Sequence, residues 1–193
     1  TEGRIDLAGR LADHAEAVVE TPAPEAVPMW AQSAGSMAAP AGLWLHPEDL
    51  SVETAGLIDP PPVTVLAVWP AKLADEQGWT DAVNHLTQEA LADGATRAAQ
   101  AFGSTVHAVR TVDLASEAMS WARNHDLRTV VAMRPAVGPW LEAGLAVEAA
   151  LARVGVGMIW RRRPWDDALY PHARRGFFPF WNAAARYIRV PPS

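Results

Sequence analysis

The sequence of 193 residues contains no cysteine, which excludes disulfides, thiolate metal sites and thiol catalysis together. No apolar run approaches the roughly 18 residues that a membrane-spanning helix requires. No secretory leader is predicted, because residues 1–4 (TEGR) are polar and the first apolar residues follow at helical spacing. We therefore expect a cytoplasmic protein. The first residue is Thr1 and not Met, which leaves a fragment and a separate subunit as alternatives.

Glycine-rich phosphate loops are also missing. Neither G-x-G-x-x-G nor the G-K-[ST] pattern occurs, so the usual sequence signals for dinucleotide and triphosphate binding are absent. The G-x-S-x-G pattern, which places a nucleophilic serine between a strand and a helix, does not occur either. The sequence therefore predicts no catalytic residue.

Acidic residues are scarce in the last part of the chain and abundant before it. The net charge is −6, in a composition that is half apolar and one-fifth charged, as in ordinary globular domains. Residues 161–193 hold seven arginines against two aspartates, a net +5, whereas residues 1–160 hold 9 basic against 20 acidic side chains, a net −11. A basic end on an acidic body indicates that the C-terminal segment faces phosphates, an acidic partner or the acidic body itself.

Strand-like and helix-like patterns alternate from residue 41 onward. Short apolar, β-branched runs predict strands at residues 42–46, 63–69, 106–111 and 129–133 and from residue 158. Capping residues and helical periodicity predict helices at residues 80–102, from Asp113 and at residues 139–154, and an aromatic-basic loop precedes a last helix that ends near residue 188. The alternation predicts an α/β fold with a Rossmann-like, doubly wound, mainly parallel sheet of about five strands.

The helical patterns also predict which side chains are buried. The inner line of the helix at residues 80–102 includes Val83, Leu86, Ala90, Ala95, Ala98 and Phe102. The helix after Asp113 carries Leu114, Ala118, Trp121 and Ala122. The helix at residues 139–154 carries Trp140, Gly144, Val147, Leu151 and Val154.

The first 40 residues differ in composition from the rest. Residues 1–20 predict an amphipathic helix that needs a partner, and its apolar positions are Ile5, Ala8, Leu11, Ala12, Ala15, Val18 and Val19. Residues 21–40 are rich in Pro and Ala and predict an extended linker, with Met29 and Trp30 as its large apolar anchors. The α/β domain is expected over residues 41–193.

Residues that could bind a ligand follow the first and fourth predicted strands. In doubly wound folds, ligands bind at the carboxyl ends of the strands, where the strand order reverses. The candidates for one crevice at this edge are His46, Glu48, Asp49, Arg134, Val137, Gly138 and Trp140. An imidazole beside two carboxylates could begin a metal site, but no further ligands stand at a recognisable spacing, so no metal is predicted.

A group of aromatic and basic residues near the C-terminus suggests a contact surface. Trp, Phe and Arg are the residue types that dominate protein interfaces, and this segment contains no nucleophile with a base. The predicted interface residues are Arg161, Arg162, Arg163, Trp165, Arg174, Arg175, Phe177, Phe178 and Trp181.

Three motifs in order resemble the α/β domain of the DNA photolyase/cryptochrome family. They are residues 43–50 (LWLHPEDL), residues 133–135 (MRP) and residues 176–181 (GFFPFW), where the family has W-F-R-x-D-L-R, N-R-x-x-x-P and G-x-P-Y-x-V-F-T-P-F-W. His46 replaces the arginine of the first motif, and Phe178 replaces the threonine of T-P-F. The positions that match are Trp44, Asp49, Leu50, Arg134, Gly176, Pro179, Phe180 and Trp181, with the helix from Pro139 to Gly155.

The resemblance implies a domain that holds, at most, a light-harvesting antenna chromophore of unknown identity. In that family, FAD and the photochemistry belong to a helical domain, so we expect any FAD in a partner domain and no confidently bound cofactor in this chain. The partner is then a FAD-binding helical domain or another protein subunit that contacts the Arg/aromatic segment, and DNA is contacted only indirectly. Two alternatives are a small nucleotide-binding α/β protein of the electron-transfer-flavoprotein or stress-protein type, and a structural interaction subunit that has lost the ligand site.

Overall fold

The computed structural model describes residues 35–173 and 176–188, in which five parallel strands form one sheet with the order β3-β2-β1-β4-β5. The strands are β1 (Ala41–Leu45), β2 (Thr64–Pro70), β3 (Thr105–Thr111), β4 (Thr129–Met133) and β5 (Gly157–Arg161). Leu43 in the central strand is aligned with Val65 of β2 and Val131 of β4. The predicted α/β class with a Rossmann-like sheet of five strands is confirmed, and this sheet is parallel throughout.

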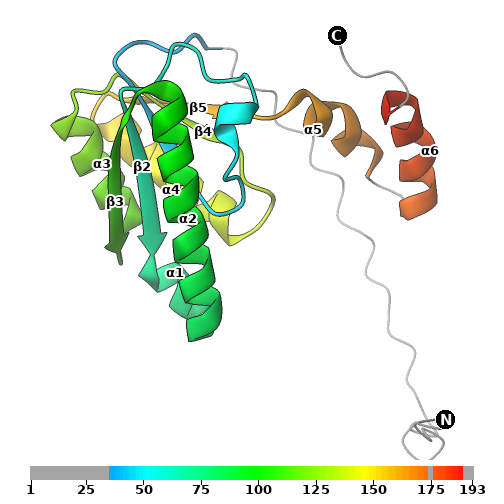
Figure 1. Cartoon of the computed structure of the whole chain (residues 1–193), viewed down its shortest axis with the longest axis horizontal. Helices are drawn as coiled ribbons and strands as arrows, with labels where there is room; N and C mark the ends of the chain where they lie inside the picture. Colours follow the sequence, from blue (N-terminus) through cyan, green and yellow to red (C-terminus); the bar gives the residue numbers. More distant parts are fainter. Residues whose placement is uncertain (1–34, 174–175, 189–193) are drawn as a thin grey trace, which may run out of the picture.

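Helices cover both faces of the sheet (Figure 1). The helical segments up to β5 are η1 (Val52–Thr54), α1 (Ala71–Glu76), α2 (Asp81–Phe102), α3 (Leu114–Asn124) and α4 (Pro139–Arg153). Figure 1 shows α2 in front of the sheet and α4 behind it. None of the helices in the described ranges is long and apolar enough to cross a membrane.

One core lies between the sheet and helices α3 and α4. The predicted inner lines of these two helices are confirmed, because their apolar positions pack against side chains of β1, β2, β4 and β5. Val154, at the end of α4, is only partly buried there. Gly42 allows the Trp121 ring of α3 to lie directly on β1, since a Cβ at this glycine would come within 2.7 Å of Trp121 Cζ2.

The second core lies between the sheet and α2. Its helical side consists of Leu91, Ala95 and Ala98, and η1 adds Val52. Met37 also joins this core, although the sequence suggested Met29 and Trp30, which lie outside the described residues, as the anchors of the linker. The predicted helix of residues 1–20 and most of the linker lie outside the described residues as well.

The predicted inner line of α2 is wrong in its first half. Val83 is 43% exposed and Leu86 is 70% exposed. A helix of 22 residues is about 33 Å long, whereas a strand of seven residues spans about 23 Å, so α2 is longer than the sheet that it covers. In Figure 1 its first turns lie below the arrowheads of β2 and β3, beyond the carboxyl edge.

After β5 the chain leaves the sheet and forms a projection, which we call the arm. The arm comprises α5 (Pro164–Leu169), η2 (Tyr170–His172) and α6 (Phe177–Ile188), and residues 41–161 are called the body. The prediction of an aromatic-basic loop after β5 is therefore wrong, because α5 and η2 form in this segment. Pro164 begins α5, where a proline costs no hydrogen bond. Figure 1 shows α6 beyond α5, away from the sheet.

Candidate functional site

The reversal of strand order lies between β1 and β4. These strands are neighbours, yet the connection after β1 packs Val52 of η1 on the α2 face, and the connection after β4 leads into α4 on the opposite face. Such a reversal opens a crevice at the carboxyl ends of the two strands. The connection from β1 to β2 contains only the three-residue η1 and no α-helix, so the helix N-terminus that usually receives a phosphate after β1 is absent.

His46 directly follows β1 and is fully buried. Its Nε2–H donates to the Met133 carbonyl at the end of β4, with a distance of 2.7 Å. Its ring stacks on Trp140 of α4 at a centroid distance of 6.1 Å and meets the edge of Trp44 at 5.7 Å. Burial lowers the pKa of His46, although the Met133 hydrogen bond and the charges of Glu48 and Asp49 oppose that shift. A neutral imidazole therefore joins β1, β4 and α4 from inside the fold.

The two carboxylates after His46 bind groups of the chain itself. Glu48 Oε2 accepts a hydrogen bond of 2.9 Å from the Ala136 backbone N–H, in the loop between β4 and α4. Asp49 receives both terminal nitrogens of Arg163, whose Nη2 lies 2.7 Å from Oδ1 and also donates to the Ser51 carbonyl at 3.2 Å. The pKa of Arg163 is raised, chiefly by its hydrogen bond to Asp49.

The remaining predicted positions lie around the N-terminus of α4. Gly138 is the N-cap residue of α4 and has φ 151°, a conformation that favours glycine. Val137 beside it is 94% exposed. Arg134 lies over the Trp160 ring with 5.9 Å from Cζ to the ring centroid, and burial lowers its pKa.

A hollow of about 360 Å³ opens beside this arrangement, between the end of β1, the first turn of α4 and the first turns of α2. Of the predicted residues, Glu48 and Trp140 line it, whereas His46 and Gly138 support it from the same edge of the sheet. Sequence reasoning missed the opposite wall. The full lining is Pro47, Glu48, Leu73, Gln77, Trp79, Val83, Thr87, Pro139 and Trp140.

One residue of the missed wall, Trp79, could have been predicted from the sequence. Trp79 immediately precedes Thr80, the predicted N-cap of α2, and Thr80 does accept a hydrogen bond from the Val83 N–H. An apolar residue before the N-cap commonly packs near the first turns of its helix. The six-residue α1, which supplies Leu73, is too short to show helical periodicity.

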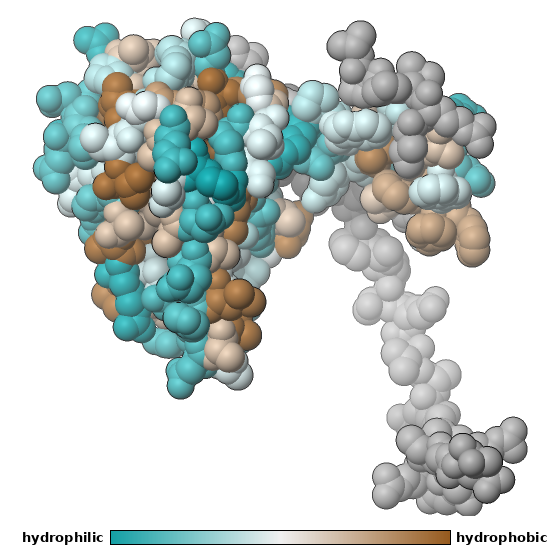
Figure 2. Space-filling model, in the orientation of Figure 1, coloured by the Kyte–Doolittle hydropathy of each residue, from teal (hydrophilic) through white to brown (hydrophobic). Residues whose placement is uncertain are grey.

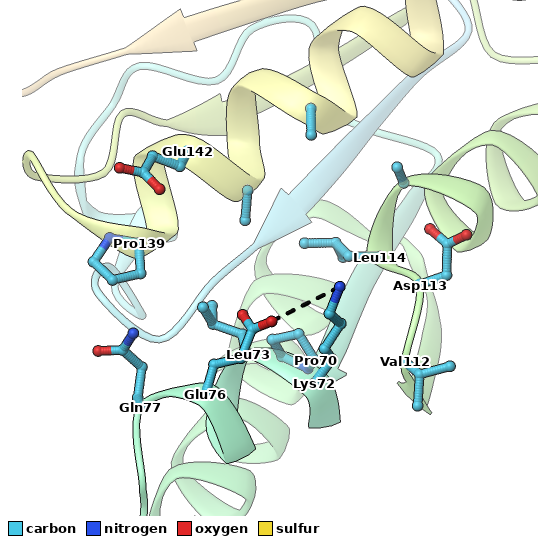
Figure 3. Close-up of a pocket in the computed structure, with 13 residues that line it drawn as sticks. Pro70, Lys72, Leu73, Glu76, Gln77, Val112, Asp113, Leu114, Pro139 and Glu142 are labelled. Atoms are coloured by element: carbon cyan, nitrogen blue, oxygen red, sulfur yellow. Dashed lines mark ion pairs between the residues drawn. The ribbon is translucent and has the colours of Figure 1, made fainter.

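A second hollow, of about 590 Å³, lies farther along the carboxyl edge (Figure 3). Side chains of α1, of the N-terminal part of α3 and of α4 surround it, and it shares Leu73, Gln77 and Pro139 with the first hollow. Lys72 and Glu76 form an exposed ion pair of 3.8 Å at its rim. Asp113 caps α3 by accepting from the Ser116 N–H at 3.0 Å, and the hydrogen bonds to Ser116 lower its pKa.

The predicted interface residues fall into two groups. The three arginines that precede the arm have partners within the chain: Arg163 binds Asp49, Arg162 forms an ion pair of 2.7 Å with Asp167, and Arg161 Nη2 donates to the Gly35 carbonyl. Arg174 and Arg175 lie outside the described residues.

The aromatic members of the predicted interface are exposed. Phe177, Phe178 and Trp181 of α6 are 65%, 76% and 48% exposed, and Trp165 of α5 is 37% exposed. The Phe177 ring stacks on Trp181 at 6.1 Å and meets the edge of Phe178 at 5.5 Å. We call these three residues of α6 the aromatic cluster. Figure 2 shows hydrophobic residues gathered on the lower surface of the arm.

Within the described part of the chain, no group of three His, Asp or Glu side chains is placed to hold a metal ion. Comparison of the chain with protein-family models, with curated proteins and with solved structures finds no match in any of the three.

Proposed function

We propose that this chain is the α/β module of a cytoplasmic, photolyase/cryptochrome-like flavoprotein, and that the 360 Å³ hollow holds a planar chromophore without a phosphate group. The module is not catalytic by itself. FAD belongs to a helical partner domain, and any contact with DNA is made through that partner.

The family part of this proposal rests on the three motifs at residues 43–50, 133–135 and 176–181, and the ligand part rests on the hydrogen bond from the Ala136 N–H to Glu48. The loop before α4 is where backbone N–H groups of a doubly wound fold would receive an anionic ligand, because helix N-termini attract negative charge. In this chain the Glu48 carboxylate already accepts the hydrogen bond of one such N–H group, that of Ala136. A phosphate brought to the same edge would meet the charge of Glu48, so the site disfavours nucleotides and favours neutral or cationic ligands.

The walls of the hollow suit a flat, conjugated ring. Trp79 and Trp140 line it together with Leu73 and Val83, and aromatic side chains favour stacked or edge-on contact with another ring. Its volume lies at the lower end of the roughly 300–1,000 Å³ found for small-molecule pockets. The small volume and the missing phosphate loop both count against the alternative of a nucleotide-binding protein of the stress-protein type.

Riboflavin and FMN test the proposal, because they share one ring system and differ by a single phosphate. We expect riboflavin to quench tryptophan fluorescence on binding to the 193-residue chain and FMN to bind about tenfold more weakly. Glu48→Gln should reduce that difference, whereas the control Glu142→Gln, which changes a carboxylate of the other hollow, should preserve it. If neither ligand binds, the chromophore proposal is wrong and the chain is better described as a structural interaction subunit. If FMN binds more tightly than riboflavin, the result supports the nucleotide-binding alternative.

A further inference from the structure

The aromatic cluster of α6 has no cover within the described residues. Among residues 177–187 of this helix, Ala184 alone is buried, and α6 packs on α5 and η2. Three large aromatic side chains on one exposed helix face mark a contact site, because clustered apolar surface rarely stays in water without a partner.

A second apolar face without a partner exists in the same chain. The apolar line from Ile5 to Val19 has helical spacing, and an isolated helix of no more than about 15 residues is marginal in water unless its apolar face is buried. These residues lie outside the described part of the chain.

The described chain begins beside the base of the arm. The Gly35 carbonyl accepts a hydrogen bond of 3.4 Å from Arg161 Nη2, and Arg161 is the last residue of β5. From there the chain runs along the sheet, since the Ala38 N–H donates to Thr129 Oγ1 at 3.1 Å. The 14 residues from 21 to 34 can span up to about 46 Å when extended, so the first 20 residues can reach α6 of the same molecule.

The charges of the two segments are complementary. Residues 1–20 contain five carboxylates against two arginines, a net −3, whereas residues 164–193, which follow the three paired arginines, hold four arginines against two aspartates, a net +2. Arg186 lies in the last turn of α6. Opposite charges favour the encounter, and a short tether raises the effective concentration of the two segments to the millimolar range.

We propose that residues 5–19 of this chain cover the aromatic cluster of α6. Leu11, Ala15 and Val18 then contact Phe177, Phe178 and Trp181, and the acidic side chains of the segment can approach Arg186 of α6. This contact does not depend on the proposed chromophore site. It would attach the N-terminal part of the chain to the arm.

Hydrogen exchange of the full 193-residue chain tests the contact. Leu11→Gln with Val18→Gln makes the apolar line polar, and the matched control is Arg10→Gln with Ala17→Gln, which changes the opposite side of the helical pattern. We expect the α6 amides of residues 181–188 to exchange about tenfold faster in the first variant and at the wild-type rate in the control, with β1 unchanged in both. Equal α6 exchange in all three proteins would overturn the proposal.

Pairs of introduced cysteines show directly which segment covers the aromatic cluster, because the chain has no cysteine of its own. We expect Ala15→Cys with Phe178→Cys to form an intrachain disulfide on mild oxidation, and Ala17→Cys with Phe178→Cys to form at least tenfold less. A disulfide between two molecules, or α6 protection that falls on dilution, would assign the surface to a second copy and overturn the contact within one chain.

Discussion

The body and the arm use the same kinds of side chain in opposite ways. In the body, Trp44, Trp121, Trp140 and Trp160 are at most 5% exposed. In the arm, the aromatic cluster and Trp165 face outward. The difference comes from the number of neighbouring layers: helices close both faces of the sheet, whereas α6 packs mainly on α5 and η2 among the described elements. Aromatic content alone therefore does not distinguish a core from a contact surface in this protein.

Removing one buried aromatic ring from the body should have the largest effect on stability. Trp121→Ala should lower the free energy of unfolding of the body by about 3–5 kcal/mol, because it leaves a cavity and removes the hydrogen bond of 3.3 Å from Trp121 Nε1–H to Thr64 Oγ1. Trp181→Ala in the arm is the control and should change the same quantity by less than about 0.5 kcal/mol. Urea unfolding followed by circular dichroism measures both. Equal losses would mean that the arm unfolds together with the body.

Adding a methyl group inside the body should have the next largest effect. A Cβ at Gly42 would press on the rings and methyls of Trp121 and Leu127, and such overpacking costs about 1–3 kcal/mol. Gly157→Ala is the matched change on β5, where the nearest atom to a new Cβ is 3.8 Å away. Its unfolding midpoint should stay within experimental error of the wild type. A Gly42→Ala protein as stable as the wild type would show that α3 can move away from the sheet.

Acid should weaken the body through His46. Burial lowers the pKa of His46 in the folded protein, so the unfolded chain takes up the proton first as the pH falls below about 6.5. Stability is therefore full above that pH and declines below it, by up to about 1.4 kcal/mol per pH unit for one proton. Urea unfolding at pH 7.5 and at lower pH should show this slope. His46→Gln should lose that part of the slope, and His85→Gln, which removes an exposed histidine, should keep it.

The ion pair between Asp49 and Arg163 joins the body to the arm and should have the smallest effect of the four. A double-mutant cycle with Asp49→Asn and Arg163→Gln should give a coupling free energy of about 1 kcal/mol, since the pair is bidentate but partly exposed. Arg163→Lys should not restore it, because an ammonium cannot bind both oxygens in the same geometry. The exposed pair Lys72–Glu76 provides the reference and should couple by about 0.3 kcal/mol or less.

Part of the site could be predicted before the structure. Glu48 and Trp140 belong to the hollow, and they were found because residues after the first and fourth strands meet at the same edge of such a sheet. Trp79 and Val83 were missed, since the helical pattern of α2 assigned Val83 to the core and nothing in it shows where the sheet ends. The ligand, the partner and the residue roles that the family resemblance implies stay predictions.

The sequence by itself determined the local elements and the faces that the regular helices bury. The strand at residues 129–133, the caps at Thr80 and Asp113, and the inner lines of α3 and α4 follow from neighbouring residues, because periodicity and capping act over one or two turns. Only the tertiary structure decided the contacts that join distant segments. His46 meets Met133 across 87 positions, Glu48 meets Ala136 across 88, and Arg163 meets Asp49 across 114. Such pairs depend on strand order, which is a property of the whole packed chain and of no local pattern.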